Sequence, residues 1–138
     1  MDRPVASPHE IRNPETLPRP SGFSHAVVAQ AGRTVYLAGQ AAQRADGSVV
    51  AGTMAEQFDV AAGNVLLALE AAGAHPQDLV SMQIFVTDIA EYQRASKQIG
   101  EAYRRHFGGH YPAMALLEVS RLFDPKALVE LMCIAVTA

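Results

Sequence analysis

A single acidic residue, Glu130, interrupts the apolar stretch from residue 128 to residue 136. Burying a carboxylate without a partner is costly, because a low-dielectric interior disfavours the charged form. In a cleft, such a group could accept and return a proton during a reaction. The alternative is an ion pair with Arg121, Lys126 or an arginine of a neighbouring chain, and the sequence leaves both interpretations open. Glu118, in the preceding apolar stretch, is a second candidate of the same kind.

The other polar residues favour neither metal nor nucleophile chemistry. His106 and His110 are four residues apart, but two glycines interrupt the helix between them, so no metal-binding pair is expected. The single cysteine, Cys133, forms no internal disulfide, and no Cys/His spacing resembles a zinc site. No serine lies in a Gly-x-Ser-x-Gly motif. His25 is interpreted as a structural, hydrogen-bonded residue.

Hydrophobic periodicity predicts the elements that position Glu130. Strands are expected at 25–30, 34–40, 48–51, 80–87, 113–119 and 128–136. One helix begins with a capping box at Thr53 and Glu56 and ends at Gly73. A second begins near Asp88 and ends before Gly108. The order βββ-α-β-α-ββ, with right-handed crossovers, predicts an α+β fold in which both helices cover one face of a mixed six-stranded sheet.

Proline usage divides the chain into two parts. Residues 1–22 hold five of the eight prolines, which predicts an extended arm and disfavours a helix or central strand there. Residues 23–138 are expected to form a single domain.

The last two predicted strands are apolar on both faces, so both faces should be buried. Two helices can cover only one face. We expect self-association to cover the other, since a closed barrel, the alternative, would leave little chain to fill its interior.

Composition narrows the function classes. The chain has 138 residues, of which 49% are hydrophobic and 18% charged, which excludes extensive disorder. A net charge of −3 without a cation cluster disfavours nucleic-acid binding. No apolar run is long enough for a membrane span, and no signal peptide is recognised, so a cytoplasmic location is expected.

Several separated motifs resemble the RidA/YjgF family, over about residues 21–137. Ala38-Gly39-Gln40 stands where the family usually has Ser-Gly-Gln. The other matching segments are Phe85-Val86-Thr87-Asp88, Tyr111-Pro112-Ala113-Met114, Glu118-Val119-Ser120-Arg121-Leu122, Val129-Glu130-Leu131 and Ile134-Ala135-Val136. The resemblance implies a chorismate-mutase-like fold and a homotrimer whose sheet faces meet, with small-molecule clefts between adjacent subunits.

The resemblance also implies a chemistry. Many relatives are reactive-intermediate deaminases that hydrolyse 2-imino or enamine acids to 2-keto acids and ammonia, with no metal or organic cofactor. An arginine binds the substrate carboxylate, and a glutamate handles the attacking water. Glu130 matches that glutamate, and Gly39 matches a glycine that lets the substrate approach closely. Leu116 matches a position whose backbone carbonyl contacts the substrate.

Four cleft positions depart from the family pattern. Met114 replaces the arginine, Phe23 a tyrosine and Ala38 a serine, and Ser96 stands for an asparagine of the second helix. Losing a bidentate arginine contact weakens binding of a small carboxylate by about two orders of magnitude or more. We therefore expect inefficient hydrolysis of 2-iminopropanoate, and a cleft suited to a less acidic or larger, more apolar ligand. The alternative is a trimer that binds a small ligand or a protein without catalysis.

Overall fold

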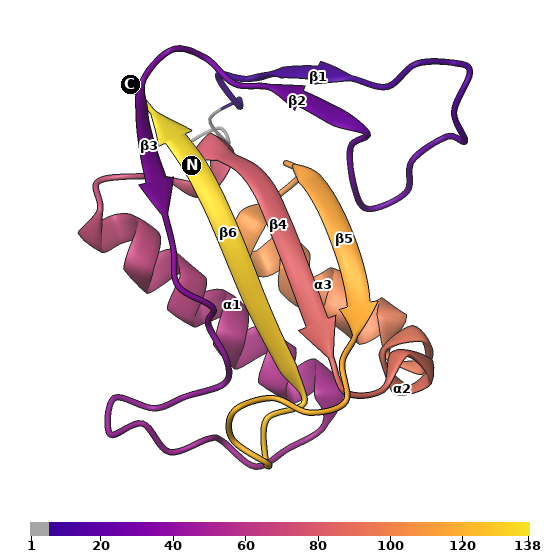
Figure 1. The fold of residues 1–138 in the computed structure, drawn as a ribbon, viewed down its shortest axis with the longest axis vertical. Coiled ribbons are helices and arrows are strands. Elements are labelled where there is room, and N and C mark those ends of the chain that lie inside the picture. Colours follow the sequence, from indigo (N-terminus) through magenta and orange to yellow (C-terminus); the bar gives the residue numbers. More distant parts are fainter. Residues whose placement is uncertain (1–5) are drawn as a thin grey trace.

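The computed structural model describes residues 6–138 (Figure 1). Its main sheet has four strands in the order β3-β6-β4-β5. These strands are β3 (Arg33–Tyr36), β4 (Leu79–Val86), β5 (Ala113–Glu118) and β6 (Val129–Thr137). β4 and β5 are parallel, and the other two pairs are antiparallel, so the sheet is mixed.

Two long helices, α1 (Met54–Ala71) and α3 (Ser96–Phe107), cover one face of this sheet (Figure 1). A short 3₁₀ helix, η1 (Pro76–Asp78), leads into β4, and the short helix α2 (Ile89–Arg94) follows it. The predicted α+β class, with the helices on one face, is confirmed. None of the helices within residues 6–138 is long and apolar enough to cross a membrane.

The strands differ in detail from the single six-stranded sheet predicted. β1 (Glu10–Arg12) and β2 (Ala26–Val28) form a separate two-stranded antiparallel sheet. β1 lies in the proline-rich arm, where Arg12 pairs with Ala26 just before the next proline. The five residues between Pro8 and Pro14 leave room for such a short edge pair.

The predicted strand at 48–51 is wrong. This segment makes only an isolated bridge between Gln43 and Val49. A side-chain amide of α1 takes one carbonyl of this segment, since Gln57 Nε2 donates to the carbonyl of Val50. Asn64 Nδ2 donates to the carbonyls of Ala41 and Gln43 in the facing segment.

The helix boundaries follow the predicted caps. At the start of α1, the Thr53 hydroxyl accepts from the Glu56 amide, and the Glu56 carboxylate accepts from the Thr53 amide. After the end of α1, Gly73 adopts a positive φ of +72°. Asp88 caps α2 by accepting from the Glu91 amide. The single helix predicted after Asp88 is broken at Ala95, where φ is −94° and ψ is 10°, and this break separates α2 from α3.

The core lies between the sheet and the helices. On β6, alternate residues Val129, Leu131, Cys133 and Ala135 are fully buried against this layer. Phe58 of α1, which has no exposed surface, packs in the same cluster. The period-two pattern of β6 therefore fixes which of its side chains face the helices.

The opposite side of the sheet, which we call the open face, carries the outward side chains of β3, β6, β4 and β5. Strand pairing sets Glu130 beside Phe85, and Phe85 beside Leu117, in one row across it. Tyr36, Leu117 and Met132 are 76%, 40% and 40% exposed. Figure 1 shows the helices behind the sheet and the open face toward the viewer. An apolar surface of this extent is typical of an interaction site.

The arm is tied to the body by a buried histidine. His9 Nδ1 accepts from the Gln30 amide at 3.1 Å, and its Nε2–H donates to the Asp78 carbonyl at 2.7 Å. Because an amide only donates and a carbonyl only accepts, these bonds define the neutral Nε2–H tautomer. The arm is thereby held at the start of β4.

His110 gives a testable pH dependence. Burial lowers its pKa from the usual 6.5, even though its Nε2–H donates to the Leu79 carbonyl at 2.7 Å. The folded state therefore binds fewer protons than the unfolded state, and stability present above pH 6.5 is lost as the pH falls below it. In urea unfolding, the free energy of unfolding should fall less between pH 7 and 5 in His110→Gln than in the wild type. The glutamine amide can still donate a hydrogen bond, but it does not take up a proton. An unchanged pH slope in that variant would contradict this assignment.

Candidate functional site

A cleft of about 600 Å³ lies between β5, α3 and the segment at residues 21–23; we call it the β5–α3 cleft. Four of the residues predicted for the site line it: Phe23, Ser96, Met114 and Leu116. Met114 and Leu116 pair with Met82 and Ile84, which face the helices, so both point to the helix side of β5. The cleft thus lies at the edge of the sheet and on its helix-covered side.

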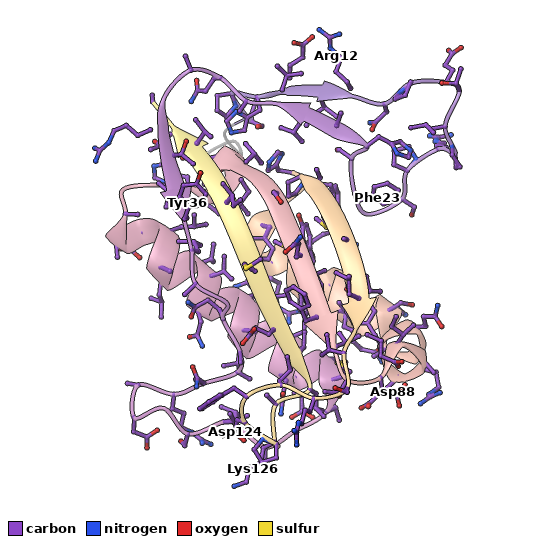
Figure 2. The ribbon with its side chains drawn as sticks, in the orientation of Figure 1. Arg12, Phe23, Tyr36, Asp88, Asp124 and Lys126 are labelled. Carbon is purple, nitrogen blue, oxygen red and sulfur yellow. The ribbon has the colours of Figure 1, made fainter. Side chains whose placement is uncertain are left out.

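Hydrogen bonds to the start of β5 position Phe23. The Ser24 amide donates to the Pro112 carbonyl at 3.0 Å, and the Ser24 hydroxyl donates to the Tyr111 carbonyl at 2.6 Å. Figure 2 shows Phe23 in the loop between β1 and β2, close to that end of β5. His25 packs edge-on against Phe23, and its Nε2–H donates to the Pro18 carbonyl at 2.6 Å. His25 is therefore structural, as interpreted from the sequence.

Three tyrosines that sequence reasoning did not select also line the cleft: Tyr92, Tyr103 and Tyr111. Tyr103 stacks on Tyr111, with the ring centroids 4.9 Å apart, and its hydroxyl donates to the His110 carbonyl at 2.6 Å. Burial raises the pKa of Tyr92 to about 12 and also raises that of Tyr103. Both phenols are neutral near pH 7. Tyr92 and Tyr103 lie at helical spacing with other apolar residues, a pattern typical of a core-facing stripe, so the sequence does not reveal that they line a cleft.

The remaining predicted site residues, Ala38, Gly39 and Glu130, form a second group. Hydrogen bonds from the Leu37 amide to Cys133 and from the Gln40 amide to Leu131 hold this segment along β6. A Cβ at Gly39 would lie 2.7 Å from Glu130 Oε2, which is too close for any side chain. The absence of a side chain at Gly39 therefore makes room for the Glu130 carboxylate.

Glu130 is half-buried. The ion pairs within residues 6–138 involve Glu10 and Asp59 as the acids, so the pairing of Glu130 with Arg121 or Lys126 considered from the sequence is absent there. Its carboxylate projects on the open face, in a row with Phe85 and Leu117.

The two groups lie on opposite faces of the sheet. Met114 and Leu116 point to the helix side of β5, whereas Glu130 points to the open face of β6, and β4 lies between these strands. One bound molecule cannot contact both groups of the same chain. The predicted site residues are thus gathered into two half-sites.

The other sequence candidates have structural roles. Glu118 Oε1 accepts from the Ile89 amide at 3.1 Å, at the first residue of α2. Burial raises the pKa of the Cys133 thiol to about 12, so it stays protonated and is a poor nucleophile. In residues 6–138, no three His, Cys, Asp or Glu side chains are grouped so that they could hold a metal ion.

The close approach at Gly39 predicts a selective effect of Gly39→Ala. The new Cβ would displace the flexible end of Glu130 without forcing backbone to move. For the imine hydrolysis that the family resemblance leads us to expect, the rate should fall about 10- to 100-fold, because a misplacement of about 1 Å can cost that much, with little change in Tm. Gly109→Ala is the matched control, since a Cβ there meets nothing within 4 Å. A wild-type rate in Gly39→Ala would contradict the role expected for Glu130.

A model of the family described as Endoribonuclease L-PSP matches residues 15–137. The chain belongs to this family. It is the RidA/YjgF family that the motifs resembled, and relatives of this family carry names of the Rid, RutC and imine-deaminase kinds.

Individual relatives of this RidA/YjgF protein agree with that assignment. A RutC family protein of Pyrococcus abyssi is 33% identical over 129 residues, covering 91% of this chain and 95% of that protein. A 2-iminobutanoate/2-iminopropanoate deaminase of Dermatophagoides farinae is 32% identical, covering 94% of this chain and 98% of that one. The crystal structure of the Rid family protein YyfB of Yersinia pestis superposes with a TM-score of 0.80 at 34% identity, covering 94% and 98%. The predicted chorismate-mutase-like fold is confirmed.

Proposed function

We propose that this protein hydrolyses small imines or enamines to a carbonyl compound and ammonia, without a cofactor, in a cleft shared by two copies of the chain. The observation that carries this proposal is the separation of the predicted site residues into two half-sites on opposite faces of one sheet. Relatives named as 2-iminobutanoate/2-iminopropanoate deaminases support the reaction class.

Glu130 is the residue that handles water in this proposal. Its carboxylate accepts a proton from water as the water oxygen forms a bond to the imine carbon, and it returns this proton to the imine nitrogen, which gives a carbinolamine. Glu130 then takes the hydroxyl proton of the carbinolamine and passes it to the nitrogen. The C–N bond breaks as the C=O bond forms, and ammonia leaves. General acid–base catalysis of this kind contributes about 10²- to 10⁴-fold.

The lining of the β5–α3 cleft supports a substrate class. Phe23, Met114 and Leu116 give it an apolar lining, and no arginine stands at position 114 to bind a carboxylate. The flexible Met114 side chain adapts to apolar groups of different shape. We expect a preference for imines with larger, more apolar substituents than 2-iminopropanoate has.

The open face supports the binding of a second copy on that side of the sheet. Its apolar side chains need a cover, and β5 is an edge strand next to the cleft, bridged on its outer side at Ala113 by Ser24. In a ring such as the trimer proposed here, one copy can bring its Glu130 to the cleft of the next.

The reaction is tested by generating 2-imino acids in situ with an amino-acid oxidase and measuring the rate of 2-keto acid formation. Imines derived from leucine and phenylalanine should be hydrolysed faster than that derived from alanine. No acceleration of any of the three would contradict the proposed reaction.

The assembly predicts the effect of a charge on the open face. Leu117→Glu should lower the sedimentation mass from a trimer to a single chain, because it places a carboxylate in the buried interface. Leu67→Glu is the control, since Leu67 is 65% exposed on α1 and should leave the mass unchanged. If the unmodified protein sediments with the mass of a single chain, a cleft shared by two chains is contradicted.

A non-catalytic ligand-binding or protein-interaction trimer is the second candidate. The departures at Phe23, Ala38, Ser96 and Met114 favour it, because they change the cleft while the fold is retained. Tight binding of 2-keto acids without turnover of any imine would favour this candidate over the enzyme.

A further inference from the structure

The β5–α3 cleft contains one charged side chain among the described residues that line it, Arg104 of α3. Its guanidinium lies over Gly100: a Cβ at Gly100 would be 3.5 Å from Nη1 and 4.0 Å from Nη2 of Arg104. Gly100 also lines the cleft, so no side chain at position 100 stands between the α3 backbone and this guanidinium.

Within residues 6–138, Arg104 takes part in no ion pair, since the ion pairs there use Arg12, Arg105 and His106 as the cations. The neighbouring Arg105 points away, to Asp59 of α1, with Nη2 at 3.1 Å from Oδ1. The two adjacent arginines therefore have different surroundings, one at a cleft and one in an ion pair between helices.

We propose that Arg104 binds the carboxylate of the ligand, in place of the arginine that β5 lacks at Met114. A guanidinium binds a carboxylate through two parallel hydrogen bonds and keeps its charge at any pH in the cell. The substrate's acid group then lies on the α3 wall, and the rest of the molecule lies against β5.

This position selects a substrate class. With the carboxylate at Arg104, the side chain of a 2-imino acid faces the apolar surface of Met114 and Leu116. A branched aliphatic or aromatic side chain fills that surface, whereas a methyl group leaves most of it unfilled. The preferred substrates are therefore branched-chain or aromatic 2-imino acids. This inference rests on the proposed function for the reaction that it serves, but the binding step can be measured without turnover.

Calorimetric binding of 4-methyl-2-oxopentanoate, a stable 2-keto acid, and of its methyl ester tests the inference. Arg104→Gln should weaken binding of the acid by about 10- to 100-fold and leave binding of the ester within about twofold. Arg105→Gln, which removes an equal charge one residue away, should change neither. Arg104→Lys should retain part of the acid binding, since a lysine supplies the charge without the fork geometry.

Equal binding of the acid by the wild type and Arg104→Gln would overturn the inference, as would a loss for the ester as large as that for the acid. Absence of acid binding to the wild type would also overturn it. Binding that depends on Arg104 without any imine hydrolysis would uphold this inference and contradict the proposed reaction. If imines are hydrolysed and KM is the same in Arg104→Gln as in the wild type, the proposed reaction is upheld and this inference is contradicted.

Discussion

Glu130→Gln is expected to lower kcat for imine hydrolysis by about 10²- to 10⁴-fold, with KM little changed. The amide keeps the shape of the side chain beside Gly39, but it cannot take a proton from water. Because Glu130 has no ion-pair partner within residues 6–138, its replacement breaks no salt bridge there, and the Tm should not fall. Steady-state 2-keto acid formation and a thermal melt measure the two quantities.

Glu118→Gln is the matched control for Glu130. Glu118 lies on β5, and its side-chain oxygen accepts from the Ile89 amide, a bond that a glutamine oxygen can also make. We expect kcat to stay within about twofold in this variant, because the hydrogen bond survives. A kcat for Glu130→Gln close to that of the wild type would exclude Glu130 as the group that activates water.

In an Arg104→Gln background, Met114→Arg is expected to lower KM for 2-iminopropanoate by about 100-fold, since a guanidinium at position 114 then gives the carboxylate the two charge-assisted hydrogen bonds that Arg104 is proposed to supply in the wild type. The half-buried Met114 side chain opens into the cleft, so a long cationic side chain can reach bound ligand and water without entering the core.

A control for the added charge is Leu67→Arg, because Leu67 is exposed on α1, outside the cleft. Its KM should equal that of the wild type. If Met114→Arg fails to lower KM in that background while the protein remains folded and assembled, a guanidinium at position 114 does not reach the substrate carboxylate.

Much of the scaffold could be predicted because its signals are local. The capping box at Thr53, the glycine at 73 and the alternation along β6 each depend on residues close in sequence. The segment at 48–51 could not be predicted, since its strand pattern competes with the side-chain amide of Gln57, which reaches the carbonyl of Val50 only after folding.

The site could be predicted as a set of residues but not as an arrangement. Alternation assigns Glu130 to one face of β6 and Met114 to one face of β5. Which of these faces coincide depends on the pairing registers through β4, and those are long-range contacts. For the same reason the sequence did not reveal Arg104, whose spacing from Gly100 matters only beside a cleft.

The most direct test of the shared cleft combines two inactive variants in one oligomer. Glu130→Gln leaves the cleft intact, and Ser96→Trp fills the cleft but leaves Glu130 intact. In a randomly mixed ring trimer, about a quarter of the sites join an intact cleft to an intact Glu130 of the next chain. Co-expressed variants should therefore regain about a quarter of the wild-type rate of 2-keto acid formation. Mixed oligomers no more active than the separate variants would contradict a site built from two chains.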